Sequence, residues 1–307
     1  MTNKLHAIVT GGCGRIGSEL VKTLLKDGWR VTVIDLSEGS CKGVKYIKSQ
    51  ILDLKELPAC DCLFHLAAKI SYSASLDELR QANLVPTQHL LNLSKGTGVK
   101  RFVFLSTSSV YNESKKPITE DMAKKPYSLY GKSKLEAEYA VQSSGIPFVI
   151  LRSSQVFGPQ FKEGYLRVLK HIKKGDINII GKGSNIIPLI HIKDLISALM
   201  FSAKNNEALS NIFNVDGNYK KSQEEFMALA AKGLRIPAPK SHISPFMAKL
   251  GTLFKGNSNV LSEYSEKLGK NREISIGKIM PLGWKPEVHL DFAMGEVISS
   301  FKKEGLL

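Results

Sequence analysis

The sequence predicts an α/β protein built on a doubly wound parallel sheet, with a smaller mixed C-terminal lobe. Three observations support this fold class. Short apolar runs of the length of buried strands recur through the first half of the chain. Segments with apolar residues at three- and four-residue spacing separate most of these runs, as crossover helices would. After residue 151 this regularity weakens, which predicts a smaller, mixed second part.

The elements follow in order along the chain. The expected strands are the apolar runs 5–10, 30–35, 61–66, 101–106 and 147–151. The helical patterns between them cover 16–26, 75–95 and 128–143, and Pro86 predicts a kink in the second of these. Four later segments also show helical spacing, namely 165–173, 193–203, 222–234 and 291–302. We expect a first domain over 1–160 and a lobe over 161–307 that packs on the carboxyl edge of the sheet and returns some segments to it.

The composition is that of an ordinary globular protein. The chain has 307 residues, of which 43% are hydrophobic, 23% charged and 8% aromatic. These values exclude disordered, collagen-like and coiled-coil classes. The N-terminus reaches a glycine cluster without an apolar signal region, and no window approaches eighteen apolar residues. We therefore expect a cytoplasmic protein that does not bind membranes.

The cysteines indicate neither a metal site nor a disulfide framework. There are four, Cys13, Cys41, Cys60 and Cys62, with a single C-x-C pair and no nearby histidine cluster at metal-ligand spacing. Reduced thiols are the plain interpretation, and they agree with a cytoplasmic location.

The net charge of +15 could indicate a nucleic-acid-binding protein, but the distribution of the basic residues argues against it. Lysines number 35 and arginines only 8, and the basic residues are dispersed without a long basic tract. Arginine is the side chain best shaped for bidentate recognition of phosphate or guanine. We expect a lysine-rich surface that favours a small anionic substrate, and no nucleic-acid partner.

A glycine-rich segment, Thr10-Gly11-Gly12-Cys13-Gly14-Arg15-Ile16-Gly17, directly follows the first strand and opens a helix. This context is the one that a dinucleotide-binding motif requires. Glycine lets the backbone turn tightly and approach a pyrophosphate, while the N–H groups at the start of the helix face the anion. A purely structural turn is the alternative. The motif predicts that Gly11, Gly14, Arg15, Ile16 and Gly17 bind a cofactor.

Asp35 indicates which dinucleotide is bound. It ends the second apolar strand, eighteen residues after Gly17, where a carboxylate can accept hydrogen bonds from both adenosine-ribose hydroxyls. The same carboxylate would repel a 2′-phosphate, and no arginine follows within residues 36–39. The sequence therefore favours NAD over NADP.

A second motif carries the chemistry. Thr107 ends a buried strand, and Tyr130 and Lys134 follow in Tyr130-Gly131-Lys132-Ser133-Lys134. On a helix the tyrosine and the lysine lie one turn apart on the same face, so the ammonium can favour the phenolate. Such a tyrosine can exchange a proton with a substrate hydroxyl or carbonyl. A surface pair beside a structural strand end is the alternative, but the nucleotide motif upstream argues against it.

These motifs, in this order, resemble the extended short-chain dehydrogenase/reductase family, in its NAD-dependent epimerase/dehydratase group, whose fold is a Rossmann sheet. Further matching stretches are Asp53-Leu54, His65-Leu66-Ala67-Ala68, Asn83, Val156-Phe157-Gly158-Pro159, His191-Ile192-Lys193-Asp194 and Leu282-Gly283-Trp284-Lys285-Pro286. Singly, His65 and Asn83 could be buried structural residues. The resemblance covers nearly the whole chain.

The resemblance implies a role for each matching residue. Asp53 and Leu54 would contact adenine, and Leu66, Ala67 and Ala68 would line the cofactor site. The Thr107 hydroxyl would bind the substrate oxygen, while Lys134 would also hold the nicotinamide ribose. The helix that carries Tyr130 would form the interface of a homodimer. Residues 1–160 would then bind NAD and carry the catalytic residues, and residues 161–307 would bind the substrate.

The chain departs from the family at the substrate end. Ile187 stands where nucleotide-sugar epimerases usually carry an arginine that holds the substrate diphosphate, and only Gln155 can imitate a family asparagine. The stretch around Ser71 resembles hydroxysteroid dehydrogenase-like and dihydroflavonol reductase-like members. Ser108-Ser109 replace the acid and base that dehydratases need. The remaining candidates for a diphosphate are Arg167, Lys170, Lys182 and Arg272.

Three functions remain in competition. The leading hypothesis is an NAD-dependent epimerase or oxidoreductase, similar to UDP-glucose 4-epimerase, that acts on a nucleotide sugar. The second is net alcohol or carbonyl redox on a non-nucleotide substrate. The third is a non-catalytic nucleotide sensor or RNA-binding relative, for which Thr107, Tyr130 and Lys134 would have no use.

Overall fold

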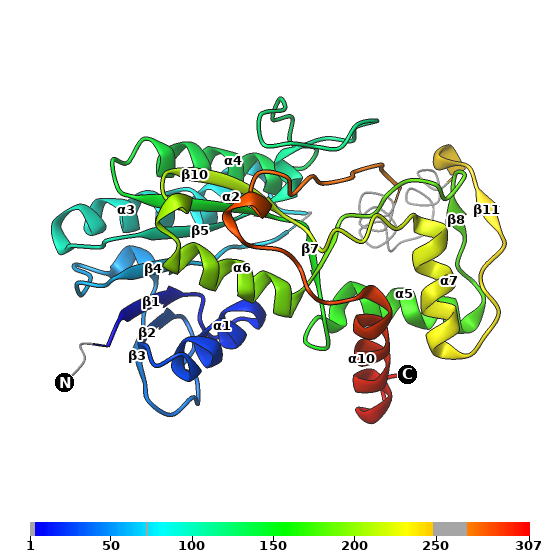
Figure 1. Ribbon diagram of the computed structural model, residues 1–307, viewed down its shortest axis with the longest axis horizontal. Coiled ribbons are helices and arrows are strands. Elements are labelled where there is room, and N and C mark those ends of the chain that lie inside the picture. Colours follow the sequence, from blue (N-terminus) through cyan, green and yellow to red (C-terminus); the bar gives the residue numbers. More distant parts are fainter. Residues whose placement is uncertain (1–3, 72, 248–268) are drawn as a thin grey trace.

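A sheet of parallel strands forms the centre of the molecule (Figure 1). The computed structural model describes residues 4–71, 73–247 and 269–307. Within them the sheet has seven strands in the order β10-β6-β5-β4-β1-β2-β3. Their bounds are β1 His6–Thr10, β2 Arg30–Asp35, β3 Val44–Lys48, β4 Cys62–His65, β5 Phe102–Thr107, β6 Phe148–Ser153 and β10 Asn211–Val215. The order reverses between β1 and β4, and such switch points open a ligand crevice at the carboxyl ends of the strands.

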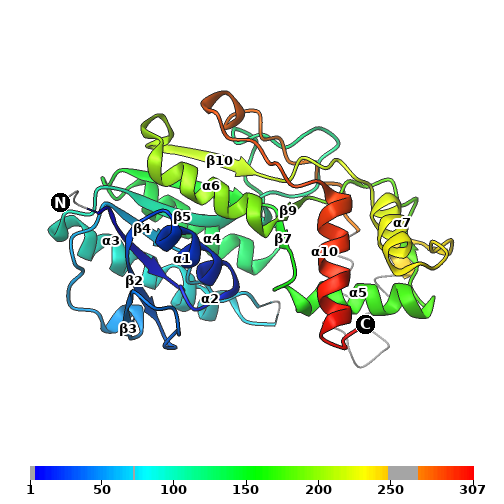
Figure 2. The same ribbon diagram turned by 60° about the horizontal axis from the view of Figure 1, so that its bottom comes forward.

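Helices cover both faces of this sheet because successive strand residues point to opposite sides. On one face, Val9 and Val33 pack with α1 (Arg15–Lys26) and α6 (Ile192–Lys204), which lie side by side (Figure 2). On the other face, Ile8 and Ile34 pack with α3 (Val85–Thr97) and α4 (Leu129–Gln142). A further helix, α2 (Leu76–Asn83), lies against α4. The strands β1, β2, β4, β5 and β6 are buried on both sides, as their continuous apolar runs predict.

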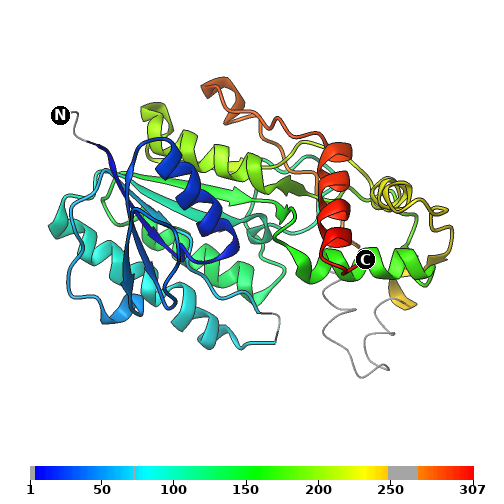
Figure 3. The ribbon, with the colours of Figure 1, turned by 90° about the horizontal axis from the view of Figure 1, so that it is seen from below.

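The C-terminal lobe lies beyond the carboxyl ends of the strands (Figures 1 and 3). Its helices α5 (Lys162–Lys174), α7 (Gln223–Leu234) and α10 (Leu290–Lys303) enclose a second apolar core. Two small sheets complete the lobe and pair β7 (Gln155–Phe157) with β9 (Leu189–His191), and β8 (Ile179–Ile180) with β11 (His242–Ile243). Short 3-10 turns occur at η1 Ile51–Asp53, η2 Ser108–Val110, η3 Asn206–Ala208 and η4 Met280–Leu282.

The predicted fold class is confirmed, and the structure corrects details of the expected elements. The helix expected over 75–95 is two helices, α2 and α3, because Leu84 separates them and Pro86 stands in the first turn of α3. The strands β3 and β10 were not expected. Most of β3 is exposed or half-buried at the sheet edge, so its apolar pattern is weak. Within the described residues, no helix is both long and apolar enough to span a membrane.

Candidate active site

The glycine-rich loop packs directly against the end of β4, at the switch point of the sheet. Gly11 has a φ of +70°, and a Cβ atom there would lie 2.8 Å from the Ala67 nitrogen. A Cβ atom on Gly17 would lie 2.1 Å from the Gly11 carbonyl oxygen. Both contacts are possible only without a side chain. The loop therefore presents bare backbone at the mouth of the crevice.

The first turn of α1 fits an anion. Its N-cap residue is Gly14, whose lack of a side chain leaves the first N–H groups without a side-chain cap, and the turn contains no acidic residue. Such a helix start is suited to a pyrophosphate. The guanidinium of Arg15, which follows the N-cap, lies over the ring of Phe161 at 5.7 Å from its centroid. A cation therefore lies beside the anion site and connects it to the start of the lobe.

Asp35 lies next to the same loop. Its Oδ2 accepts a hydrogen bond from the Cys13 N–H at 3.0 Å, and its Oδ1 accepts one from the Ser37 N–H at 3.1 Å. These donors fix the carboxylate at the end of β2, and each oxygen keeps a lone pair for a ribose hydroxyl. The arrangement fits the ribose diol of NAD and disfavours a 2′-phosphate.

The other predicted cofactor residues differ in exposure. Leu66 and Ala67 are half-buried and Ala68 is exposed, so they can face a ligand. Asp53 is also exposed, whereas the Leu54 side chain is buried in the core against the sheet. The Leu54 carbonyl accepts a hydrogen bond from His89 Nε2 at 2.9 Å. Of this pair, only Asp53 is exposed to a ligand, and its predicted contact with adenine stays a prediction.

His65 is a structural histidine. It is buried between the hydroxyls of Thr10 and Thr87, at 2.7 and 2.9 Å from its two ring nitrogens. Burial lowers its pKa to about 3, and the neighbouring Lys134 acts in the same direction, so the ring is neutral. It holds the end of β4 to β1 and to α3.

Asn83 is also structural and connects the cofactor side to the catalytic helix. Its side chain pairs with the backbone N–H and carbonyl of Lys69 at 2.8 and 3.1 Å. Its amide also donates to Ser133 Oγ in α4 at 3.0 Å. The segment after β4 is thereby fixed to the helix that carries Tyr130.

The structure brings the start of α4 directly onto the segment that follows Thr107. Ser128 caps α4 by accepting a hydrogen bond from the Gly131 N–H at 3.0 Å. A Cβ atom on Gly131 would lie 2.2 Å from the Ser109 carbonyl oxygen. The hydroxyl of Thr107 accepts from the Ser109 N–H at 3.1 Å. Tyr130 therefore stands beside the end of β5, as the motif predicts.

The electrostatics of the tyrosine and lysine pair differ from the expectation. We expected Lys134 to lower the pKa of Tyr130, but burial raises the pKa of this phenol above its ordinary value. Lys134 is only 2% exposed, and its ammonium lies 3.9 Å from the centroid of the Phe104 ring. Burial lowers the pKa of Lys134 to about 7, while Glu138 opposes this shift. Desolvation thus determines the direction of the pKa shift at both Tyr130 and Lys134.

A buried polar network behind α4 was not foreseen from the sequence. Arg152 in β6 is 1% exposed and forms an ion pair with Glu138 at 2.7 Å. Arg152 Nη1 donates a hydrogen bond to the Tyr111 hydroxyl at 2.6 Å. The Tyr111 hydroxyl in turn donates to Asn214 Oδ1 in β10 at 2.9 Å. Glu138 lies one turn after Lys134, so the network fixes the helix that carries Tyr130 and Lys134. An arginine within an apolar strand was the available signal.

Comparison with known proteins agrees with this geometry. The model of the NAD dependent epimerase/dehydratase family matches residues 7–216. The chain belongs to this family. It is accordingly an NAD-dependent enzyme of the extended short-chain dehydrogenase/reductase type, and its cofactor is NAD.

Individual relatives cover most of the chain. A UDP-glucose 4-epimerase of Corynebacterium glutamicum is 31% identical over 94% of this chain and 92% of its own length. An uncharacterized protein of Sinorhizobium fredii is 33% identical over 62% of this chain, which spans 52% of that relative. The UDP-glucuronic acid 4-epimerase of Bacillus cereus, solved with NAD, has a TM-score of 0.79 at 23% identity over 98% of this chain and 99% of its own. The last comparison confirms the fold.

Among the predicted substrate residues of this family member, Arg272 is connected to the Thr107 segment through Tyr127 and Ser109. It is 1% exposed, and its guanidinium lies 4.5 Å from the centroid of the Tyr127 ring. The Tyr127 hydroxyl is 3.0 Å from Ser109 Oγ, which in turn is 3.2 Å from Thr107 Oγ1. The backbone N–H of Arg272 also donates a hydrogen bond to the Ile186 carbonyl at 3.1 Å. Sequence reasoning missed Tyr127, which stands in no recognised motif position, and it considered Ser109 only as a replacement for a dehydratase residue.

The other substrate candidates are less well placed. Arg167 and Lys170 are exposed on α5, and Lys182 is exposed in the turn after β8. The Ser71 hydroxyl accepts a hydrogen bond from the Ala74 N–H at 3.1 Å, which forms the turn before α2. Gln155 begins β7, where its N–H donates to the Pro188 carbonyl at 3.2 Å. Their roles in substrate binding stay predictions.

Proposed function

We propose that this enzyme is a nucleotide-sugar 4-epimerase. The observation that carries the proposal is that the anion-binding start of α1 follows β1 and Thr107 ends β5, so both stand at the carboxyl edge of the parallel sheet, where α4 with Tyr130 and Lys134 packs on η2. Similarity to a UDP-glucose 4-epimerase over nearly the whole chain supports it.

Each catalytic residue has a defined part in this reaction. Tyr130 removes the proton from the sugar hydroxyl, and the Thr107 hydroxyl donates a hydrogen bond to the same substrate oxygen. Bound NAD supplies a hydride acceptor that becomes the donor for the reverse transfer. Lys134 in its charged form stabilises the phenolate and holds the nicotinamide ribose. Tyr130 then returns its proton to the reformed hydroxyl, so the epimerisation has no net redox change.

We assign the substrate diphosphate to Arg272 because this predicted cation is connected to the Thr107 segment through Tyr127 and Ser109. Its stacking on Tyr127 holds the guanidinium plane in place, and the neighbouring Lys270 lies over the same ring at 4.9 Å. Added salt should weaken diphosphate binding mainly at the half-buried Lys270, because charges accessible to solvent are screened over about 8 Å at physiological ionic strength, whereas Arg272 is 1% exposed and is screened much less. UDP titration at low and high salt, with wild type and Arg272→Ala, tests the assignment.

The proposed reaction is tested by incubating the NAD-bound enzyme with UDP-glucose and following UDP-galactose by NMR. The Tyr130→Phe variant keeps the ring but lacks the proton carrier, and it should lose roughly a hundred- to ten-thousand-fold in rate. NAD binding by this variant, measured by calorimetry, serves as the control for folding. Unchanged turnover in Tyr130→Phe would disprove the role of this tyrosine.

One observation supports a second candidate function, net alcohol or carbonyl redox on a non-nucleotide substrate. Ile187 is 3% exposed and packs in the core of the lobe with Phe157 and Leu189, so no cation stands at the family position for a diphosphate. Accumulation of NADH from an uncharged alcohol, together with no UDP binding, would establish this alternative.

The proposal includes a cytoplasmic homodimer. Leu129 and Tyr139 on α4 are 48% and 55% exposed. With Lys132 and Glu136 they follow helical spacing along one stripe, which a second copy of α4 could cover. The free thiols of the four cysteines agree with a reducing compartment. Sedimentation equilibrium of wild type and Tyr139→Glu tests the dimer, because the added charges would repel each other across the interface.

A further inference from the structure

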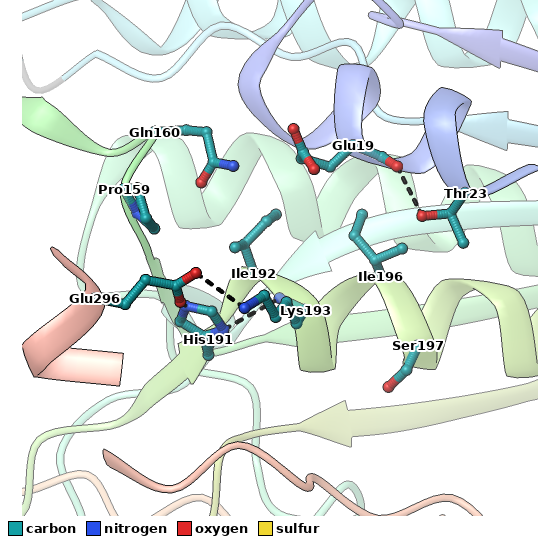
Figure 4. Close-up of a pocket in the computed structure, with 10 residues that line it drawn as sticks. All are labelled: Glu19, Thr23, Pro159, Gln160, His191, Ile192, Lys193, Ile196, Ser197 and Glu296. Atoms are coloured by element: carbon teal, nitrogen blue, oxygen red, sulfur yellow. Dashed lines mark hydrogen bonds and ion pairs between the residues drawn. The ribbon is translucent and has the colours of Figure 1, made fainter. Parts of the chain in front are cut away.

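A cleft of about 250 Å³ opens where α1, α6 and α10 meet (Figure 4). It lies on the α1 and α6 side of the sheet, whereas Tyr130 belongs to α4 on the other side. Its lining includes the polar residues Gln160, His191 and Glu296 and the apolar residues Pro159, Ile192 and Ile196. The cleft is therefore distinct from the catalytic segment.

Three buried polar atoms in this cleft make no hydrogen bond within the described part of the chain. They are Gln160 Oε1, His191 Nε2 and Glu296 Oε2. His191 is fully buried, and its Nε2 lies 3.3 Å from Glu296 Oε2. A Cβ atom on Gly158 would lie 3.3 Å from Gln160 Oε1 and 3.5 Å from His191 Nε2. Buried polar atoms without a partner are uncommon and indicate a missing ligand or water.

The hydrogen-bonding character of these atoms can be assigned. His191 Nδ1 accepts from the Lys193 N–H at 3.4 Å, so Nε2 carries the ring proton and is a donor. Burial lowers the pKa of His191 to about 4, which keeps the ring neutral. Glu296 Oε1 is paired with Lys193 Nζ at 2.9 Å, which leaves Oε2 as an acceptor, like Gln160 Oε1. The cleft thus offers two acceptors and one donor.

The other polar residues of the lining already have partners in the described part of the chain, namely Glu19, Thr23, Lys193 and Ser197, and the remaining three lining residues are apolar. Figure 4 shows the side chains of Ile192 and Ile196 rising from α6 between these polar groups and α1, with Pro159 on one side. An occupant therefore needs an apolar body and a polar group that donates two hydrogen bonds and accepts one. A primary carboxamide meets this requirement. A carboxylate cannot donate, and an ammonium group cannot accept from His191.

The geometry points to a binding site in this cleft for a small neutral ligand that carries a primary carboxamide on an apolar body. A single water could satisfy the three polar atoms, but its share of liquid volume is only about 30 Å³. The rest of the 250 Å³ would hold further water beside the isoleucines, which a ligand with an apolar body would displace. The site does not depend on the proposed epimerase activity.

Benzamide is a suitable probe, and NAD-saturated protein is the suitable form because the cofactor site is then closed to it. We expect saturable binding in the millimolar range by NMR titration, and binding of benzoate at least tenfold weaker. Gln160→Leu removes one acceptor with little change in size and should weaken benzamide binding at least tenfold. Gln88→Leu, at an exposed position of α3, is the matched control and should leave binding unchanged.

Two further measurements keep the inference falsifiable. A crystal soaked with benzamide should show its amide at Gln160 and Glu296, and circular dichroism should show that Gln160→Leu is folded. Ordered water alone in the cleft of the soaked crystal would overturn the inference. So would equal affinity for benzamide and benzoate, or benzamide binding that Gln160→Leu leaves unchanged.

Discussion

Gly131 in α4 and Ser109 in η2 are in direct backbone contact, so that a Cβ atom on Gly131 would lie 2.2 Å from the Ser109 carbonyl oxygen. No side chain fits between the two segments. This contact sets the distance between Tyr130, which precedes the glycine, and Thr107, which precedes η2. The catalytic pair is thus positioned by backbone packing.

Gly131→Ala should therefore impair catalysis more than folding. The added methyl group must push α4 away from η2, at a cost of about 1–3 kcal/mol in the free energy of unfolding. The same displacement should lower kcat at least tenfold, because it separates Tyr130 from Thr107. Urea unfolding and epimerase assays measure the two effects.

The matched control is Gly96→Ala in α3, where a Cβ atom has no neighbour within 4 Å. This change should raise stability by roughly 0.4–1 kcal/mol, because alanine favours the helix. If Gly131→Ala behaved like Gly96→Ala, the contact with Ser109 would not position the catalytic residues.

Asp35→Ala should weaken NAD binding and narrow the preference for NAD over NADP. The carboxylate that the Cys13 and Ser37 N–H groups fix at 3.0 and 3.1 Å would no longer bind the ribose diol or repel a 2′-phosphate. Calorimetry with both cofactors measures the change. Glu38→Ala removes an exposed carboxylate three residues later and should leave the preference intact. Tighter binding of NADP than NAD by wild type would contradict the assignment of Asp35.

Stability should fall as the pH drops below about 6.5, in part because of His65. Burial holds the pKa of this histidine at about 3 in the folded state, against 6.5 for an exposed ring. Between these values the unfolded chain binds a proton that the folded protein does not, so unfolding becomes more favourable as the pH falls. Above 6.5 both states are neutral and the effect vanishes.

Urea unfolding of wild type and His65→Leu from pH 7 to pH 4 checks this linkage. The variant should be less stable at pH 7, since Thr10 and Thr87 lose a hydrogen-bond partner, but its stability should fall less steeply with pH. Part of the dependence of stability on pH should remain in the variant, because burial also lowers the pKa of His191 to about 4. Identical slopes would show that His65 is protonated in the folded state.

Arg152→Met should be strongly destabilising, because it leaves the fully buried Glu138 without its cation. Removal of one partner from a buried ion pair costs about 3–5 kcal/mol. The double variant Arg152→Met/Glu138→Leu should recover part of this loss, since no unpaired charge is left. Urea unfolding of the single and double variants measures both values.

The exposed pair Arg80–Glu136 provides the comparison. Its atoms lie 2.8 Å apart, similar to the 2.7 Å of the buried pair, but the arginine side chain is 38% exposed. Arg80→Met should therefore cost less than about 1 kcal/mol. Equal losses for Arg80→Met and Arg152→Met would mean that burial of Arg152 has no energetic consequence.

The sequence predicts the sheet well where local signals coincide with tertiary structure. The strands from β1 to β6, apart from β3, are buried on both faces, so burial itself produces the apolar runs that reveal them. In the edge strand β3, exposed residues such as Lys45 alternate with half-buried ones. Its hydrophobic pattern therefore resembles that of a loop. In β10, Asn214 joins the buried polar network, which interrupts the apolar run.

The predicted catalytic and cofactor motifs can be read from the sequence because each of them is local, and the roles of their residues stay predictions. The position of Arg272 beside Tyr127 could not be predicted, because it depends on how the chain returns from the lobe to α4. The pKa of Lys134 could not be predicted either, since the spacing from Tyr130 says nothing about burial. Spacing places the two side chains on one face of the helix, and only the packing of Phe104 and α4 determines how much water reaches them.

The place of β10 at the edge of the sheet has a consequence for synthesis of the protein. This strand pairs with β6, yet it leaves the ribosome only after β7, α5, β8, β9 and α6. Until then β6 (Phe148–Ser153) is an unpaired strand edge whose residues are destined almost entirely for the interior. A nascent chain stalled or truncated near residue 160 would display that edge to other chains and to chaperones. Completion of the sheet therefore waits for translation of α5, β8 and β9 of the lobe, whereas α7 and α10 are translated only afterwards.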